Sequence, residues 1–133
     1  MEVRRASLII LYTKDGKILL QHRDENAERS PNQWGYFGGG IEDGETPEQA
    51  VRRESLEEIE YEIKNPKLID EEAENDSPHT TQYTYAEAYD STQPIVLHEG
   101  QGYGWFTVQE ALLLPMSEHR RTCLEKLAPL IFN

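Results

Sequence analysis

The chain is poor in the residues that cross-link proteins, span membranes or bind nucleic-acid backbones. Its 133 residues include one cysteine, Cys123, so no disulfide forms within the chain, which suits a reducing cytoplasm. Cys123 lies in a helical pattern with Leu124 and Leu127, which favours packing over a role as a nucleophile. No apolar run approaches the roughly 18 residues of a membrane span. The apolar run from Leu8 to Leu11 is also too short for a signal peptide, so we expect a cytoplasmic protein.

Basic residues are scarce as well. Thirteen Lys and Arg residues stand against 25 Asp and Glu residues, for a formal net charge of −12. A field of this sign repels nucleic-acid backbones, and no basic stripe interleaved with aromatic residues offsets it. A phosphate-bearing substrate therefore needs a cation to mediate its binding. The length fits a single domain over residues 1–133, and a homodimer stays open.

Turn and capping signals divide the chain into strands and helices. Asp15-Gly16 marks a hairpin within residues 7–23. Further strand patterns cover residues 67–72, 81–90 and 94–108, the last being a strand or two broken by glycines. Capping signals predict helices from Pro47 to about Ile59, after Thr107, and from Glu118 to about Ile131. This order of elements predicts a mixed sheet flanked by helices.

The helix from Pro47 carries a crowd of carboxylates. Glu54, Glu57 and Glu58 fall on one face, because side chains three and four positions apart are neighbours on a helix. Hard divalent cations such as Mg²⁺ prefer oxygen ligands of this kind. The alternative is an ordinary solvated acidic face. The glycines of 38–40 lie just upstream and let backbone approach a metal or a phosphate closely, which favours a Mg²⁺-phosphate site.

A spaced motif runs through this region. It consists of a glycine, five residues, Glu, seven residues, Arg-Glu, two residues and Glu-Glu, at Gly39, Glu45, Arg53, Glu54, Glu57 and Glu58. The motif resembles the Nudix box, and the flanking "WGYFGGG" and "EGQGYGWF" are similar to the MutT-like branch of that family. The resemblance implies an α/β/α sandwich around a mixed β-sheet. It also implies a hydrolase acting on nucleoside diphosphates linked to another group, with Mg²⁺ or alternatively Mn²⁺.

The resemblance implies a metal site and a brace for it. The metal ligands would be Glu54, Glu57 and Glu58, joined by the backbone carbonyl of Gly38. Glu45 would pair with Arg53 and hold the glycine loop against the helix, a role that suits the forked guanidinium better than a lysine.

The same resemblance implies a base and substrate contacts. Glu54 is the first candidate to accept the proton of the attacking water, and Glu99 is the second candidate and a further metal ligand. Arg23 matches a position that meets substrate phosphate, although a plain surface arginine fits it equally well. Gly39 and Gly40 would lie against the substrate.

Three residues depart from the motif and its flank. Glu60 stands where the box ends in a glycine, which usually adopts a left-handed conformation there. Ser55 replaces an apolar residue on the inward side and would weaken a thin apolar stripe. Phe37 takes the place of a common proline. None of these positions is an expected ligand, so they bear on the end of the helix rather than on catalysis.

The substrate is less closely defined by the sequence. Ser117 stands near the place where relatives use an asparagine to bind an oxidised guanine, so that substrate has no support here. Trp34, Tyr36 and Trp105 either stack on a base or pack in the core. We expect a nucleoside triphosphate to be cleaved to a monophosphate and pyrophosphate. The alternatives are a nucleotide sugar, a dinucleoside polyphosphate, or a non-catalytic nucleotide-binding module.

Overall fold

A computed structural model describes residues 4–28, 30–73 and 80–132 of the chain. In this part of the chain, seven strands form one sheet. The strands are β1 (Arg4–Tyr12), β2 (Lys17–His22), β3 (Trp34–Gly35), β4 (Phe37–Gly40), β5 (Lys67–Ala73), β6 (Thr80–Ala88) and β7 (Gly102–Thr107). The helices are α1 (Pro47–Ile59), α2 (Val108–Ala111) and α3 (Glu118–Ile131).

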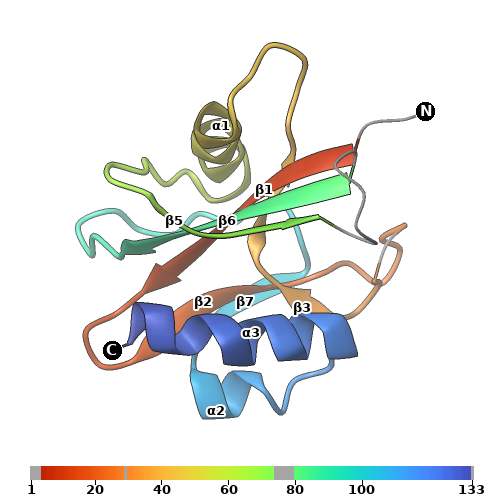
Figure 1. Ribbon diagram of the computed structural model, residues 1–133. Helices are drawn as coiled ribbons and strands as arrows, with labels where there is room; N and C mark the ends of the chain where they lie inside the picture. The colour runs from red at the N-terminus through yellow and green to blue at the C-terminus, as the bar shows by residue number, and fades with distance from the viewer. Residues whose placement is uncertain (1–3, 29, 74–79, 133) are drawn as a thin grey trace.

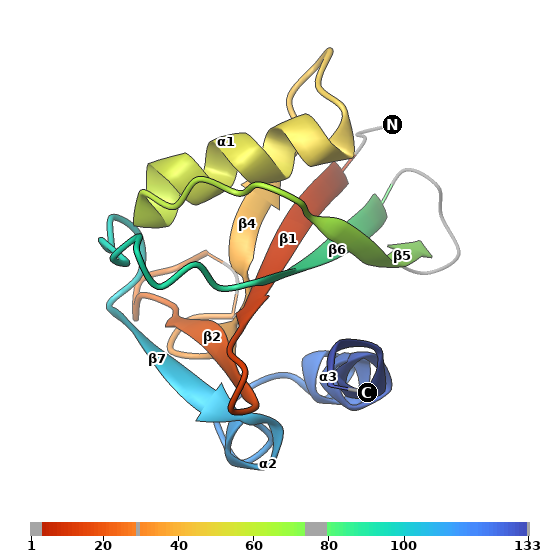
Figure 2. The same ribbon diagram turned by 90° about the vertical axis from the view of Figure 1, so that its left-hand side faces the viewer.

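The sheet is mixed. Its main path is β3-β2-β1-β6-β5, with β4 pairing with β1 and β7 pairing with β2. Strands β1 and β6 are parallel from Arg4 opposite Thr80 to Tyr12 opposite Ala88, and the other pairs are antiparallel. Helix α1 lies on one side of the strands and α3 lies on the other, as Figures 1 and 2 show. This arrangement is the predicted α/β/α sandwich.

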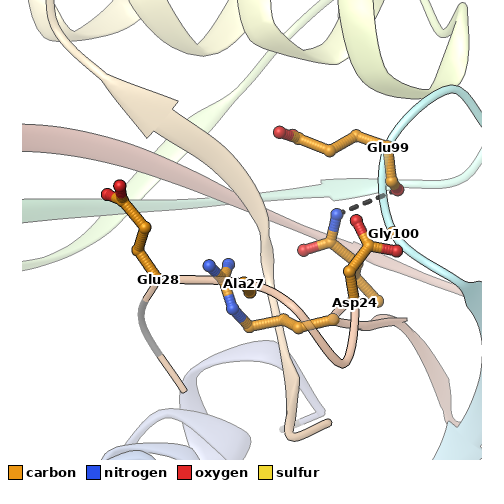
Figure 3. A pocket seen from close by; sticks show the side chains of 7 residues that line it. Asp24, Ala27, Glu28, Glu99 and Gly100 are labelled. Carbon is orange, nitrogen blue, oxygen red and sulfur yellow. Dashed lines mark hydrogen bonds between the residues drawn. The ribbon is translucent and has the colours of Figure 1, made fainter. Parts of the chain in front are cut away.

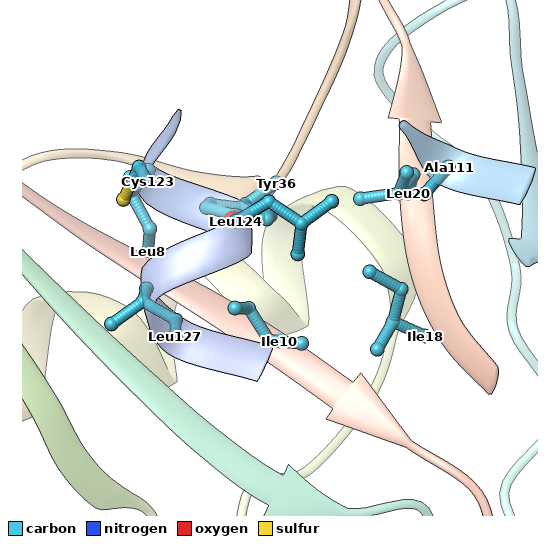
Figure 4. Close-up of a cluster of buried hydrophobic side chains, with 9 residues drawn as sticks. All are labelled: Leu8, Ile10, Ile18, Leu20, Tyr36, Ala111, Cys123, Leu124 and Leu127. Carbon is cyan, nitrogen blue, oxygen red and sulfur yellow. The ribbon is translucent and has the colours of Figure 1, made fainter. Parts of the chain in front are cut away.

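The central strand β1 is covered on both faces. Ile9 and Leu11 pack on the α1 side together with Val51 and Ile59. The alternate residues Leu8 and Ile10 point to the other face, because side chains alternate along a strand. There they join a cluster with α3 (Figure 4), whose members are Leu8, Ile10, Ile18, Leu20, Tyr36, Ala111, Cys123, Leu124 and Leu127. The two-sided burial explains why β1 is an almost continuous apolar run.

The predicted helices are confirmed. Thr46 caps α1, and its side chain accepts a hydrogen bond from the backbone N–H of Gln49, while the Gln49 side chain accepts one from Thr46. Thr107 and Glu110 form the same reciprocal pair at α2. Ser117 caps α3. Local capping chemistry therefore places the start of each helix at the expected residue.

The strand predicted within residues 94–108 is only partly right. Strand β7 begins at Gly102, and Gly102 and Gly104 lie inside it rather than interrupting it. The preceding segment is not a strand, because its N–H groups bind elsewhere. Val96 donates to the carbonyl of Ile59 and His98 donates to that of Glu58, so the segment closes the end of α1. In the part of the chain that the structure describes, no helix is long and apolar enough to cross a membrane.

Candidate active site

Arg53 is the centre of a hydrogen-bonded network on α1. Its Nε and Nη2 donate to the two carboxylate oxygens of Glu45 at 2.8 and 3.0 Å, and Nη2 also donates to the carbonyl of Gly40 at 3.0 Å. This paired contact lowers the pKa of the Glu45 carboxyl and raises that of Arg53. The geometry is the brace expected from the sequence, because one side chain ties the loop before α1 to the helix.

Arg53 also binds the carboxylates of its own helix. Its Nη1 donates to Glu54 at 3.0 Å and to Glu57 at 3.2 Å. Glu54 is largely buried, with a side chain that is 14% exposed, whereas that of Glu57 is 58% exposed. Desolvation raises the pKa of the Glu54 carboxyl despite the nearby guanidinium. Glu54 therefore lies between the interior and the solvent-facing surface of the helix.

The glycines make room for these carboxylates. A Cβ atom on Gly39 would lie 2.7 Å from the carboxylate of Glu54, and one on Gly38 would lie 2.1 Å from the carbonyl of Ser7. Gly38 also has a φ of +142°, which side chains disfavour. The glycines were expected to admit a metal or a phosphate. They admit strand β1 and Glu54, and a contact with a ligand stays a prediction.

Glu58 faces inward. It is 4% exposed, and its Oε1 accepts a hydrogen bond of 2.9 Å from the N–H of Gly38. Desolvation, followed by its contact with Glu99, raises the pKa of the Glu58 carboxyl well above its usual range. Glu99 comes close because α1 holds the segment before it, through the bond from His98 N–H to the Glu58 carbonyl at 2.7 Å. The end of α1 thus brings together Glu58 and Glu99, which are 41 positions apart in the chain.

The donor set suits a hard divalent cation. Glu54, Glu57, Glu58 and Glu99 offer carboxylate oxygens, and the contact between Glu58 and Glu99 sets two acidic groups against each other, which a cation would relieve. Across residues 4–28, 30–73 and 80–132, however, no three acidic, His or Cys side chains are arranged as a metal site. Arg53 holds two of the carboxylates instead.

The departures from the motif belong to the end of α1. Glu60 has the left-handed conformation of the missing glycine, with φ 53° and ψ 35°. Its N–H donates to the Leu56 carbonyl, which is the bond of an αL cap, and the N–H of Tyr61 donates to the Ser55 carbonyl. The buried Ser55 hydroxyl donates to the Tyr61 carbonyl at 2.8 Å, so the serine supports this cap rather than weakening the helix. Phe37 is 1% exposed and packs in the core.

Arg23 lies between two cavities. The first has a volume of about 320 Å³ and combines Arg23 with Asp24, Glu28 and Glu99. Figure 3 shows these acidic side chains around the cavity, with the backbone carbonyl of Glu99 accepting a hydrogen bond of 3.0 Å from Gln21. Gln21 gave no signal in the sequence, although it fixes the loop that carries Glu99.

The second cavity lies on the α3 side of the sheet and extends to the glycines of β4. It has a volume of about 230 Å³ and reaches from Gly38 and Gly39, beside the carboxylates, to Ser117 and Arg120 at the start of α3. Arg23, Trp34, Tyr36 and Gln82 also line it. Ser117 can be singled out from the sequence, whereas Gln82 and Arg120 cannot, because no local motif marks them. Trp105 does not line this cavity and instead packs on the α1 side of the sheet.

Comparisons with known proteins show the family and the fold. A family model described as the NUDIX domain matches residues 2–127. The MutT NUDIX hydrolase of Burkholderia pseudomallei has a similar structure, with a TM-score of 0.76, 25% identity and coverage of 96% of this chain and 99% of that one. The MutT protein of Methanosarcina mazei aligns with a TM-score of 0.80 at 17% identity, over 99% of this chain and 97% of that one.

A curated relative matches a shorter region. The nucleoside triphosphatase NudI of Salmonella agona is 41% identical over 56 residues, which is 42% of this chain and 40% of the relative. The matched region thus spans less than half the length of the curated relative.

Proposed function

The chain belongs to the NUDIX domain family, and from this premise we propose that it hydrolyses the pyrophosphate link of a small nucleotide. The preferred substrate is a nucleoside triphosphate, which water would convert to a monophosphate and pyrophosphate. The partial match to a nucleoside triphosphatase supports this choice. The observation that carries the proposal is the Arg53 network, which holds Glu45, Glu54 and Glu57 beside the buried Glu58. The match over residues 2–127 also supports our expectation of one domain.

Nudix hydrolases use divalent metal ions, and we propose Mg²⁺ here, with Mn²⁺ as the alternative. Carboxylate oxygens of Glu54, Glu57, Glu58 and Glu99 would hold it, joined by the Gly38 carbonyl. When bound, such an ion lowers the pKa of water and neutralises charge on phosphate oxygens. The net charge of −12 makes such mediation necessary, because the bare surface repels a polyphosphate.

The protein's own residues would divide the remaining work. Glu54 would accept the proton of the attacking water, with Glu99 as the second candidate, while the bond from phosphorus to the bridging oxygen breaks. Arg53 and Glu45 would keep the glycine loop and α1 in register. Arg23 would meet the phosphates together with Gly39 and Gly40, at the junction of the two cavities. The single cysteine is consistent with a cytoplasmic enzyme.

The test is hydrolysis of a substrate panel with Mg²⁺, Mn²⁺ or a chelator. The panel contains nucleoside triphosphates, nucleotide sugars and dinucleoside polyphosphates, and the products are identified. We expect triphosphates to be cleaved to monophosphate and pyrophosphate only when metal is present. Glu57→Gln should lower the rate more than about tenfold, since metal-site substitutions cost 10- to 100-fold. Glu48→Gln, an exposed change on the same helix, is the matched control.

Other outcomes would change the proposal. Cleavage confined to nucleotide sugars or dinucleoside polyphosphates would replace the substrate and keep the chemistry. No turnover of any substrate at high protein concentration would favour a nucleotide-binding module without catalysis. Survival of metal-dependent hydrolysis within about tenfold in Glu57→Gln would exclude Glu57 from the metal site.

A further inference from the structure

The α3 end of the second cavity contains polar atoms that the protein leaves unsatisfied. Among the described residues, the buried side-chain atoms without a hydrogen-bond partner are the hydroxyl of Tyr36 and Nη1 of Arg120. Both residues line this cavity, and the Arg120 guanidinium lies 4.5 Å over the centre of the Tyr36 ring. Buried polar groups are nearly always paired, because leaving them unpaired costs stability. The two groups also act on each other, since burial raises the pKa of the Tyr36 hydroxyl while the Arg120 side chain lowers it, and they therefore lie close enough to bind one ligand atom together.

Arg120 is also poorly placed for stability. It lies in the first turn of α3, where the positive end of the helix dipole disfavours a cation. No carboxylate of the described residues pairs with it, although the chain has 25 acidic residues for 13 basic ones. Its neighbour Arg121, by contrast, binds Glu118 and two backbone carbonyls. A half-buried arginine kept in such a position points to a role in binding.

The residues that line the second cavity differ from one part of it to another. One end is at Gly38 and Gly39, in contact with Glu58 and Glu54. The other end is at Arg120, at the start of α3. If the pyrophosphate link lies at the carboxylates, the base lies toward α3, against Tyr36. The position of Arg120 therefore favours contact with the base over contact with the phosphates.

The chemistry of these groups selects the base. A guanidinium only donates hydrogen bonds, so its partner must be an acceptor. Burial raises the pKa of the Tyr36 hydroxyl, which stays neutral and can donate as well. Carbonyl oxygens on guanine, hypoxanthine, uracil and thymine are acceptors, whereas the amino groups at the same ring positions of adenine and cytosine are donors. The amino group of adenine or cytosine would face the donor groups of Arg120 without an acceptor between them, which disfavours these two bases.

We propose that Arg120 and Tyr36 recognise a carbonyl oxygen of the substrate's base, so that the preferred substrates are nucleotides with an oxo group at this ring position. This assignment rests on the proposed hydrolysis of small nucleotides and adds a base class to it. Arg120 and Tyr36 act here as specificity-determining residues, away from the reacting phosphorus.

The test uses substrates that differ at the ring carbon bearing the oxo or amino group. We compare kcat/KM for ITP with that for ATP, and kcat/KM for UTP with that for CTP. The wild-type protein should prefer the oxo member by roughly tenfold or more, as expected for a site built to hydrogen-bond its substrate. Arg120→Met should bring both ratios to within about threefold of one, and Tyr36→Phe should lower them less. Lys126→Met removes a charge from the same helix and should leave the ratios unchanged.

Binding measurements separate this assignment from the proposed hydrolysis. Dissociation constants of IMP and AMP, which have no pyrophosphate link to cleave, are measured with Mg²⁺ present and should show the same preference and the same loss in Arg120→Met. If no nucleotide is hydrolysed but IMP binding depends on Arg120, the hydrolase proposal fails and the base assignment stands. Equal weakening of all nucleotides in a folded Arg120→Met protein would mean that Arg120 binds phosphate, which overturns the assignment. A wild-type ratio near one would also overturn it.

Discussion

Helices α1 and α3 pack on opposite faces of the same sheet, but different kinds of contact hold them there. The buried side chains of α3 are Cys123, Leu124 and Leu127, which fill an apolar cluster (Figure 4). The inner face of α1 is thinner, and its buried side chains are Ala50, Val51, Ser55, Glu58 and Ile59.

Polar contacts compensate for the thin apolar face of α1. Arg53 ties the helix to the preceding loop, and Arg52 donates to the carbonyls of Ile63 and Lys64. Ser7 donates to the carbonyl of Pro47 at the start of the helix. Helix α1 is thus held by directional bonds, which fix its rotation and height more narrowly than apolar packing does. A helix that presents the carboxylates proposed to bind metal needs that precision.

The largest expected effect is on activity, where the same substitution should act very differently on α1 and on α3. Glu54→Gln on α1 should lower kcat/KM by about 10²- to 10⁴-fold, because it removes the proposed base and a metal ligand. Glu125→Gln makes the same change on the exposed face of α3 and should keep the rate within about twofold. Steady-state hydrolysis of the preferred triphosphate measures both.

Thermal and urea unfolding complete this comparison. Glu54→Gln should change the free energy of unfolding by less than about 1 kcal/mol, since glutamine still accepts a bond from Arg53 and a desolvated charge is lost. Equal losses of activity in both variants would mean that α1 has no special role. A loss in Glu54→Gln accompanied by unfolding would mean that Glu54 acts in stability.

The bounds of both helices could be predicted from the sequence, but the side-chain contacts of α1 could be predicted more completely than those of α3, for a physical reason. Thr46, Glu45, Arg53 and Glu54 interact over one loop and a few helical turns, so their spacing in the chain nearly determines their contacts. Arg120 and Tyr36 meet only when β4, its preceding turn and α3 have packed on the sheet, and no spacing along the chain records this. Glu99 is intermediate, since a motif marked it but the end of α1 places it beside Glu58.

The helix contacts themselves can be tested by truncation. Leu124→Ala should lower the free energy of unfolding by about 2–5 kcal/mol, because it opens a cavity in the apolar cluster. Ser55→Ala removes much less volume but leaves the buried carbonyl of Tyr61 without the serine hydroxyl, which costs about 1–3 kcal/mol. Urea unfolding at one pH measures both variants. The exposed Leu56→Ala is the control and should cost about 0.5 kcal/mol.

If Ser55→Ala lowers the free energy of unfolding no more than Leu56→Ala does, the hydrogen bond from Ser55 to the Tyr61 carbonyl does not stabilise α1. The position would then be explained by the small size of the buried serine alone. The contrast between a polar and an apolar attachment of the two helices would then rest on Arg52 and Arg53.

The smallest expected effect is at the end of α1. Glu60 is left-handed, a conformation that costs a non-glycine residue about 1–2 kcal/mol. Its carboxylate forms a hydrogen-bonded pair with His98, so replacing it changes both the backbone and this pair. Glu60→Gly and Glu60→Ala both lose the pair, and they differ mainly in the freedom of the backbone. We expect Glu60→Gly to be more stable than Glu60→Ala by about 1 kcal/mol, measured by thermal unfolding under identical conditions. Equal stability would show that the left-handed conformation of Glu60 carries no strain that glycine relieves. The backbone bonds that Glu60 and Tyr61 donate would then be enough to hold this turn.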